Sequence, residues 1–402
     1  MSPYVSYAVI IFILCSLVYA QVYRASSTTK RINLSSSNEI RNLLDPPTPL
    51  AEQLTARATS NARLMRAFSI HSTFVHGDID THTTFTKAAV ELISRHRLPW
   101  TLFADIASNV VDAHLHRLSS VAFDTFISRI TLHVVIVGLL QLEPSFYKID
   151  PDDLDVVAGN INRLWTMSKT TTEIPSHMLA EVNVRLHRWL PTYSNPIEFV
   201  IPVYETLWRV IAVTVALNHN RSDVRAVFAA FLSQPDSRRY HYIPDGDPSV
   251  EVVMQEVLRL YPPTRRISRT YTASDFNLKY LPSFLAQCMT RTITQVADIE
   301  ALQRDSVWGV DVNDYDPMRH LPQRCGEAQR RTLLAFGAGK LTCVAKTWAP
   351  HAAAVIVATI LDRVGDGDKT EFEVVAGGGI GGRSGWDGWR IQRVGRGEEI
   401  VG

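Results

Sequence analysis

A single cysteine near the end of the chain stands between a glycine-containing turn and a long apolar segment. Residues 336–345 read FGAGKLTCVA, and residues 344–363 are apolar enough to form a buried helix. A helix N-terminus stabilises a thiolate, and glycine lets the backbone approach a flat cofactor closely. Cys343 is therefore a candidate metal ligand, with Phe336 and Gly339 beside a bound cofactor. The alternative is a buried structural cysteine next to a glycine turn.

The composition excludes two common uses of cysteine and one class of partner. The chain has four cysteines among 402 residues, far apart and without a CxxC spacing. This is too sparse for a disulfide-stabilised domain, and it lacks the paired ligands of a structural zinc site. The formal net charge is +1, which argues against nucleic acid as a partner because such binding needs a basic face.

Residues 1–23 are predicted to be a transmembrane signal anchor. Residues 4–23 (YVSYAVIIFILCSLVYAQVY) carry no charge and are long enough to cross the hydrocarbon core of a bilayer. Basic residues follow within 24–31, which predicts that the rest of the chain stays on the cytosolic side. A cleaved signal peptide ending near Ala20 is the alternative, although such peptides usually begin with basic residues.

The remainder divides into a linker and one folded body. Residues 24–49 are polar, rich in serine and threonine, and end in prolines, which predicts a linker. Residues 50–402 are expected to form a mainly helical body with a small β portion. Helical periodicity fades between about 270 and 340, and the tail segments FEVV and GWRIQRV alternate in the manner of strands.

Two further motifs carry charged residues that are able to meet. In residues 251–269 (EVVMQEVLRLYPPTRRISR), Glu256 and Arg259 lie three positions apart, on one face of a helix that two prolines end. In residues 314–320 (DYDPMRH), Arg319 is able to bind the same carboxylate, because one guanidinium group serves two partners. Taken alone, the ExxR pattern also describes an ordinary surface ion pair.

The order of these motifs resembles the cytochrome P450 family. ExxR with LYPPTRR, then DPxR, then FGxGxxxCxA and an apolar helix follow one another as in that family, and the anchor is similar to that of fungal membrane-bound members. The resemblance covers roughly residues 195–402, including ADIEALQRDSVWG at 297–309. It implies a P450-like fold and haem b (iron protoporphyrin IX) ligated by Cys343. It also implies a buried structural triad: Glu256, Arg259 and Arg319.

The same resemblance gives a role to residues 194–217, which are expected to form the central helix over the haem. Glu205 and Thr206 stand where the family has an acid–alcohol pair, so they are the expected catalytic residues, although the family's small residues before them are absent. Pro202 lacks an N–H group and is expected to open the helix locally. The alternative is that Glu205 pairs with Arg209 on a solvated face while Thr206 only packs.

One departure from the family pattern concerns the acidic groups of the haem. The family usually has Arg or His two positions before the cysteine, where this chain has Leu341. Arg266 or Arg269, after the LYPP turn, are the expected replacements as cofactor-binding residues. His82 and Lys87 are further candidates, in a segment that lacks the family's WxxxR pattern.

The resemblance implies a haem-thiolate monooxygenase that inserts one oxygen atom of O2 into an apolar small-molecule substrate, in fungal secondary metabolism. It implies an NADPH-dependent flavoprotein reductase and membrane lipid as partners, with the catalytic domain on the cytosolic face of the endoplasmic reticulum. Asn33 and Asn220 lie in N-glycosylation sequons, and neither is glycosylated if the body is cytosolic. Two alternatives stay open, the second because the part before Glu205 is shorter than in typical eukaryotic members and because Leu341 departs from the family pattern. They are a P450-type isomerase, dehydratase or cyclising oxidase, and a non-catalytic membrane-anchored haem protein.

Overall fold

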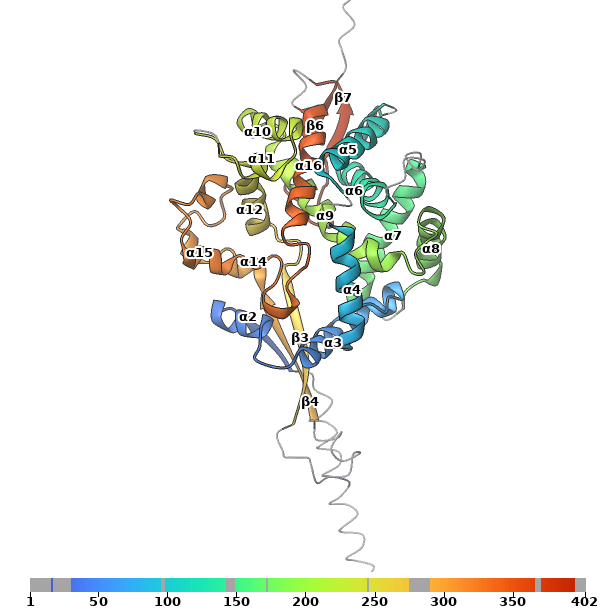
Figure 1. Ribbon diagram of the computed structural model, residues 1–402, viewed down its shortest axis with the longest axis vertical. Coiled ribbons are helices and arrows are strands. Elements are labelled where there is room, and N and C mark those ends of the chain that lie inside the picture. Colours follow the sequence, from blue (N-terminus) through green and yellow to red (C-terminus); the bar gives the residue numbers. More distant parts are fainter. Residues whose placement is uncertain are drawn as a thin grey trace, which may run out of the picture.

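Helices make up most of the folded body, as the sequence predicts, and two small sheets lie at opposite ends of it (Figure 1). The computed structural model describes residue 16 and residues 30–394, except 95–97, 117, 142–148, 171–172, 244–245, 275–289 and 366–369. The predicted anchor over residues 4–23 therefore lies outside the described residues, apart from residue 16.

Helices α9 (Ile197–Asn218) and α16 (Trp348–Arg363) form the middle of the molecule. Both are apolar around most of their circumference, which is typical of helices that are covered on all sides. α16 packs against α9, α5 (Trp100–Leu115) and α10 (Ser222–Ser233), and α6 (Phe123–Val134) packs on the other side of α9.

The remaining helices surround this core or connect it to the sheets. Their bounds are α2 Ser37–Leu44, α3 Leu50–Phe68, α4 Ile79–Leu92, the π-helical η1 Val135–Gln141, α7 Pro151–Thr170, α8 Ser176–Trp189, α11 Ser237–His241, α12 Val250–Leu260, α14 Ile299–Leu302, η4 Ser306–Trp308, η5 Pro317–His320, α15 Glu327–Thr332 and η6 Gly339–Leu341. The last helix of the core begins four residues later than the sequence predicts, because residues 344–347 form turns.

Two helical segments are long and apolar enough to cross a membrane, Phe123–Leu140 and Ile197–Asn218. Within them 83% and 72% of the apolar windows are buried inside the protein, which is the behaviour of core helices. They are thus weak evidence for membrane spans.

The first sheet has the strand order β1-β4-β3. β1 (Lys30–Leu34) runs parallel to β4 (Thr290–Asp298), and β3 (Arg266–Ser274) runs antiparallel to β4 with Arg266 opposite Asp298. Helix α2 follows β1 and buries Ile40, Leu43 and Leu44 against residues near the end of β4.

Residues 30–44 therefore belong to the folded body, in contrast to the linker that the sequence predicts for residues 24–49. Ile40, Leu43 and Leu44 recur at helical spacing and present one apolar face, and the side chain of Ser36 caps the start of the helix. The sequence prediction missed this short apolar face because most of the surrounding residues are polar.

The second sheet closes the opposite end, with the order β2-β7-β6-β5. Its strands are β2 Ser120–Ala122, β5 Val364–Gly365, β6 Phe372–Val375 and β7 Arg390–Arg393, so both predicted tail strands are confirmed. The glycine-rich segment between β6 and β7 folds over two tryptophans: Trp386 donates to the carbonyl of Gly382 at 3.0 Å, and Trp389 to that of Gly379 at 2.8 Å. A Cβ on Gly381 would lie 2.7 Å from the Trp386 ring, so only glycine fits this approach.

Candidate functional site

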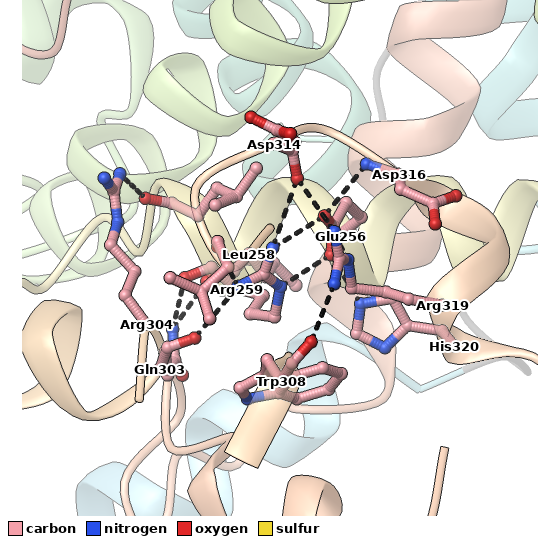
Figure 2. Close-up of polar contacts among 12 residues, drawn as sticks. Glu256, Leu258, Arg259, Gln303, Arg304, Trp308, Asp314, Asp316, Arg319 and His320 are labelled. Atoms are coloured by element: carbon pink, nitrogen blue, oxygen red, sulfur yellow. Dashed lines mark hydrogen bonds and ion pairs between the residues drawn. The ribbon is translucent and has the colours of Figure 1, made fainter. Parts of the chain in front are cut away.

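Three side chains and one backbone group converge on the carboxylate of Glu256 (Figure 2). Arg259 donates to it from Nε at 2.7 Å and from Nη2 at 2.8 Å. Arg319 donates from Nε at 3.1 Å, Nε2 of His320 lies at 2.8 Å, and the N–H of Asp316 donates at 3.1 Å. The structure thus brings together the three residues that the sequence assigns to a triad and adds His320, which the sequence analysis gave no role.

Local structure explains this convergence. Helix α12 places Glu256 and Arg259 one turn apart on its buried face, and both side chains are 0% exposed. The 3₁₀-helix η5 begins after Asp316, whose carboxylate caps it, and it presents Arg319 and His320 side by side.

Electrostatics keep Glu256 ionised in this buried position. Burial by itself raises the pKa of Glu256, but the hydrogen bonds from Arg259 and His320, together with their charges, outweigh it and lower the pKa to about 2. A buried carboxylate with this many donors is a rigid anchor, because loss of any partner leaves an uncompensated charge.

Two side chains connect this anchor to the segment that precedes Cys343. Gln303 donates from Nε2 to the carbonyl of Arg259 at 3.0 Å and accepts at Oε1 from the N–H of Leu334 at 2.8 Å. The Trp308 ring centroid lies 5.1 Å from the Arg259 guanidinium, and its Nε1 donates to Thr332 at 2.9 Å. Figure 2 shows Gln303 bonded to the backbone of Arg259, and the carbonyl of Trp308 bonded to Arg319. The Glu256 anchor therefore holds residues 332–334 from two sides.

The loop that carries Cys343 is closed by its own backbone. The N–H of Cys343 donates to the carbonyl of Phe336 at 3.0 Å. Gly337 and Gly339 have φ values of +72° and +68°, a region that side-chain-bearing residues rarely adopt. A Cβ on Gly339 would also collide with the side chain of Asp45, so this glycine lets the loop lie against the turn after α2.

Cys343 is an exposed residue of this loop. Desolvation by the surrounding protein raises the pKa of the Cys343 thiol, and the N–H of Ala345, directed at the sulfur, partly offsets that rise. By contrast, Cys325 is buried. Of these two cysteines, Cys343 alone offers its sulfur to a ligand, and a metal must displace the thiol proton to bind it.

The two predicted catalytic residues lie on different faces of α9. Glu205 is 1% exposed and is held by Arg209 at 2.8 Å and by both terminal nitrogens of Arg383. Thr206 is half-buried and donates to the carbonyls of Pro202 and Val203, each at 3.4 Å. Glu205 does pair with Arg209, but inside the protein and not on the solvated face that the alternative interpretation expects.

The comparisons with known proteins give partial sequence matches and a similarity of fold. No protein-family model matches the chain. It is 32% identical over 130 residues to cytochrome P450 714A2 of Arabidopsis thaliana, covering 30% of this chain and 23% of that protein. It is 32% identical over 111 residues to pentalenene oxygenase of Streptomyces avermitilis (28% and 23%) and 34% identical over 119 residues to cyclooctat-9-en-7-ol 5-monooxygenase of Streptomyces melanosporofaciens (29% and 24%).

Among solved structures, the fold is similar to a mutant heme domain of cytochrome P450DA, with a TM-score of 0.61 and 14% identity over 90% of this chain and 87% of that one. It is also similar to P450 OxyD, involved in the biosynthesis of vancomycin-type antibiotics, with a TM-score of 0.54 and 18% identity over 90% of both chains. The fold of this chain is therefore similar to that of cytochrome P450s, and part of its sequence is similar to members of that family. The matched segments span less than a quarter of the curated relatives. These relatives come from a plant and from bacteria, so a fungal, membrane-anchored P450 is not confirmed.

The similarity to cytochrome P450s implies a haem, and the residues around Cys343 fit one. The exposed thiol is a soft ligand suited to iron. At Gly337 a Cβ would meet no atom within 4 Å, so the backbone there is open to a flat neighbour, as it is expected to be beside a cofactor. Phe336 lies at the base of the same loop, partly buried against the core.

Two arginines fit the acidic side chains of a haem. Arg269 on β3 is 8% exposed, and its guanidinium donates to the carbonyl of Ser268. Arg57 on α3 donates to Thr73, yet its buried Nε has no partner. Desolvation and the nearby charge of Arg269 lower the pKa of Arg57 to about 10. Among the described residues no carboxylate forms an ion pair with either guanidinium, so both are suited to bind an acid from outside the chain.

The other residues that the sequence suggests for binding the acidic side chains of a haem differ in position. Arg266 points outward, is 63% exposed and pairs with Asp298 at 3.0 Å. It cannot share a site with Arg269, because residues three apart on a strand face opposite sides of the sheet. His82 lies next to Arg57, since its Nδ1 is 2.9 Å from the Thr73 hydroxyl to which Arg57 donates, whereas Lys87 is exposed. Nothing in the spacing of α3 singles out Arg57, so the sequence analysis missed it.

Proposed function

We propose that this protein is a haem-thiolate monooxygenase that inserts one oxygen atom of O2 into an apolar small molecule. The observation that carries the proposal is the exposed thiol of Cys343, on a loop that the buried Glu256 anchor holds in place. Two relatives bear the names pentalenene oxygenase and cyclooctat-9-en-7-ol 5-monooxygenase, which supports an oxygenase acting on a compact apolar skeleton.

In this proposal the chain's residues hold and orient the haem. Cys343 is its metal ligand, Phe336 and Gly339 lie beside it, and Arg57 and Arg269 bind its acidic side chains. When bound, the haem supplies the oxygen chemistry, and thiolate ligation favours O–O cleavage. Glu256, Arg259 and Arg319 keep the loop rigid, so that the thiolate stays at one position.

Thr206 is the proposed proton-delivering residue. It lies on the half-buried face of α9 together with Phe199, Pro202, Val203 and Arg209, and we expect the substrate to lie along this face. Its hydroxyl bonds to the helix backbone are long, so exchange to a water molecule costs little. Glu205 is its proposed link to solvent, which requires Arg383 to release the carboxylate.

The proposal extends to the setting of the enzyme. An NADPH-dependent flavoprotein reductase supplies electrons, residues 1–23 anchor the chain in the endoplasmic reticulum membrane, and the product belongs to fungal secondary metabolism. NADPH consumption in the presence of a reductase separates this proposal from a non-catalytic haem protein, which binds haem and consumes nothing.

The decisive experiment is the reduced carbon monoxide difference spectrum of the purified protein. We expect the red-shifted Soret band of a thiolate-ligated haem, its loss in Cys343→Ser, and its retention in Cys325→Ser, which alters a buried cysteine outside the loop. A Cys343→Ser protein that keeps this band contradicts the assignment of Cys343.

A further inference from the structure

The carboxylate of Glu205 lies among more positive charges than it can neutralise. Arg209 follows it by one turn on α9, and Arg383 reaches it from the glycine-rich segment between β6 and β7. Arg63 on α3 and Lys169 on α7 lie close enough for their charges to interact with both Glu205 and Arg383. We call these five residues the Glu205 cluster.

Trp165 on α7 organises two members of the cluster. The guanidinium groups of Arg63 and Arg383 each lie 5.0 Å from the centroid of its ring. Arg63 is further fixed by a 2.6 Å bond to the hydroxyl of Ser168. Three segments distant in the sequence, α3, α7 and the loop after β6, therefore direct cations to one point beside α9.

The cluster holds four cations for one carboxylate. Desolvation and neighbouring guanidinium groups lower the pKa values of Arg63, Lys169 and Arg209, the last to about 10. Arg265 adds to this field but has a carboxylate of its own, Glu300, at 3.5 Å. In the described part of the chain, the Lys169 side chain has no hydrogen bond or ion pair. Arg63, Arg209 and Arg383 are partly buried, whereas Lys169 is exposed, so the excess positive charge inside the protein comes from the three guanidinium groups. Buried charge of one sign is costly unless an opposite charge compensates it.

We infer that the Glu205 cluster binds an oxyanion, a carboxylate or a phosphate, attached to the apolar body of the substrate. The inference rests on the proposed function and narrows its substrate class from apolar molecules to amphipathic acids. Arg209 belongs both to the cluster and to the half-buried face of α9 that carries Thr206. An anion held there places the attached apolar skeleton along that face, beside the proposed proton donor.

Matched ligands test the inference directly. Decanoate, decyl phosphate and 1-decanol share a ten-carbon chain and differ in charge, and isothermal titration calorimetry of the haem-loaded full chain measures their affinities. We expect at least one of the two anions to bind at least about tenfold more tightly than the alcohol, as charge-assisted hydrogen bonds confer. The preference should shrink as salt is added. Equal affinities for all three ligands overturn the inference.

Two variants and a control locate the effect. Lys169→Gln removes a cation whose side chain makes no hydrogen bond or ion pair within the described residues, so folding should be unaffected; Arg63→Gln removes a second. Each is expected to weaken binding of the preferred anion by about tenfold and leave decanol binding unchanged. Arg393→Gln, on β7 and paired with Glu371 away from the cluster, is the control and should change neither. Unchanged anion binding in both variants contradicts the site.

The test of the anion site and the test of the proposed function are able to fail separately. If the carbon monoxide spectrum lacks a thiolate band while the full chain still prefers an anion, the monooxygenase proposal fails and the anion site stands. If the band is present and the anions bind no better than decanol, the Glu205 cluster is only a structural group of ion pairs, and the inference fails alone.

Discussion

At the scale of single residues, the proposed chemistry depends on the thiol of Cys343 and the buried carboxylate of Glu256. Their pKa values are shifted in opposite directions. Desolvation by the surrounding protein raises the pKa of the Cys343 thiol, and a metal displaces the thiol proton when it binds. The donors around Glu256 lower the pKa of that carboxyl to about 2, so its charge persists across the physiological range. Cys343 therefore changes its protonation state when a metal binds, whereas Glu256 keeps its charge and holds the loop in place.

Replacement of Glu256 by Ala should be among the most damaging single changes. It leaves Arg259, Arg319 and His320 buried without their shared acceptor, at a cost of roughly 3–5 kcal/mol. Against a total stability of roughly 5–15 kcal/mol, the variant should misfold or fail to retain haem. Thermal unfolding and haem content per protein measure this, with Glu371→Ala as a control because Glu371 is 56% exposed. Stable, haem-loaded Glu256→Ala protein contradicts the anchor role.

Thr206→Ala tests the proton-delivery proposal. The change removes one hydroxyl from a half-buried position, so folding and haem content should survive. Product formed per NADPH consumed should fall about tenfold or more, with hydrogen peroxide rising in its place. Thr214→Ala removes another hydroxyl from α9, one that bonds to the carbonyl of Val210 at 2.7 Å, and serves as the matched control. An unchanged product ratio in Thr206→Ala assigns the residue to packing.

At the scale of elements, sequence patterns predicted the long helices and tail strands, because apolar periodicity is strong over many residues. The ExxR and DPxR spacings also predicted which charges meet around Glu256. Helix α2 was missed because its apolar stripe is only Ile40, Leu43 and Leu44. Arg57 and Arg383 were missed because tertiary contacts alone bring them to their sites, and no local pattern encodes such contacts.

The pair of histidines between α5 and α6 should make stability sensitive to mild acid. His114 Nε2 and His133 Nδ1 are 3.0 Å apart, and burial lowers their pKa values from 6.5 to about 3 and about 4. Arg129 adds to the shift of His114. Because the unfolded chain binds more protons than the native state below pH 6.5, stability falls as the pH drops from 6.5 toward 4.

Urea unfolding between pH 7 and 4 checks this expectation. Glu256 stays ionised in that range and does not contribute, whereas His82, whose pKa is also lowered by desolvation, adds to the loss from the histidine pair. The double variant His114→Leu/His133→Leu should show a flatter dependence of the unfolding free energy on pH, and His76→Gln, an exposed change, should keep the original slope. An unchanged slope in the double variant contradicts the role of the pair.

At the scale of the whole molecule, the first described residues brace the loop that carries the ligand. Arg41 on α2 donates to the carbonyl of Arg331 at 3.0 Å, and Lys340 donates to the carbonyl of Thr48 at 3.1 Å. Gly339 lies against Asp45 in the same region. The start of the body and the cysteine loop therefore contact one another.

This closeness sharpens the prediction of an anchor at residues 1–23. The body begins at Lys30, so residues 24–29 span at most about 20 Å and leave the body near the membrane. A chain lacking residues 1–23 should leave the membrane fraction while it still binds haem.

Asn33 and Asn220 are both exposed, so a lumenal body would be glycosylated at both and a cytosolic body at neither. Endoglycosidase treatment of protein expressed in a eukaryotic cell decides between them: a shift in mass contradicts the cytosolic orientation, and membrane retention of the truncated chain contradicts the anchor.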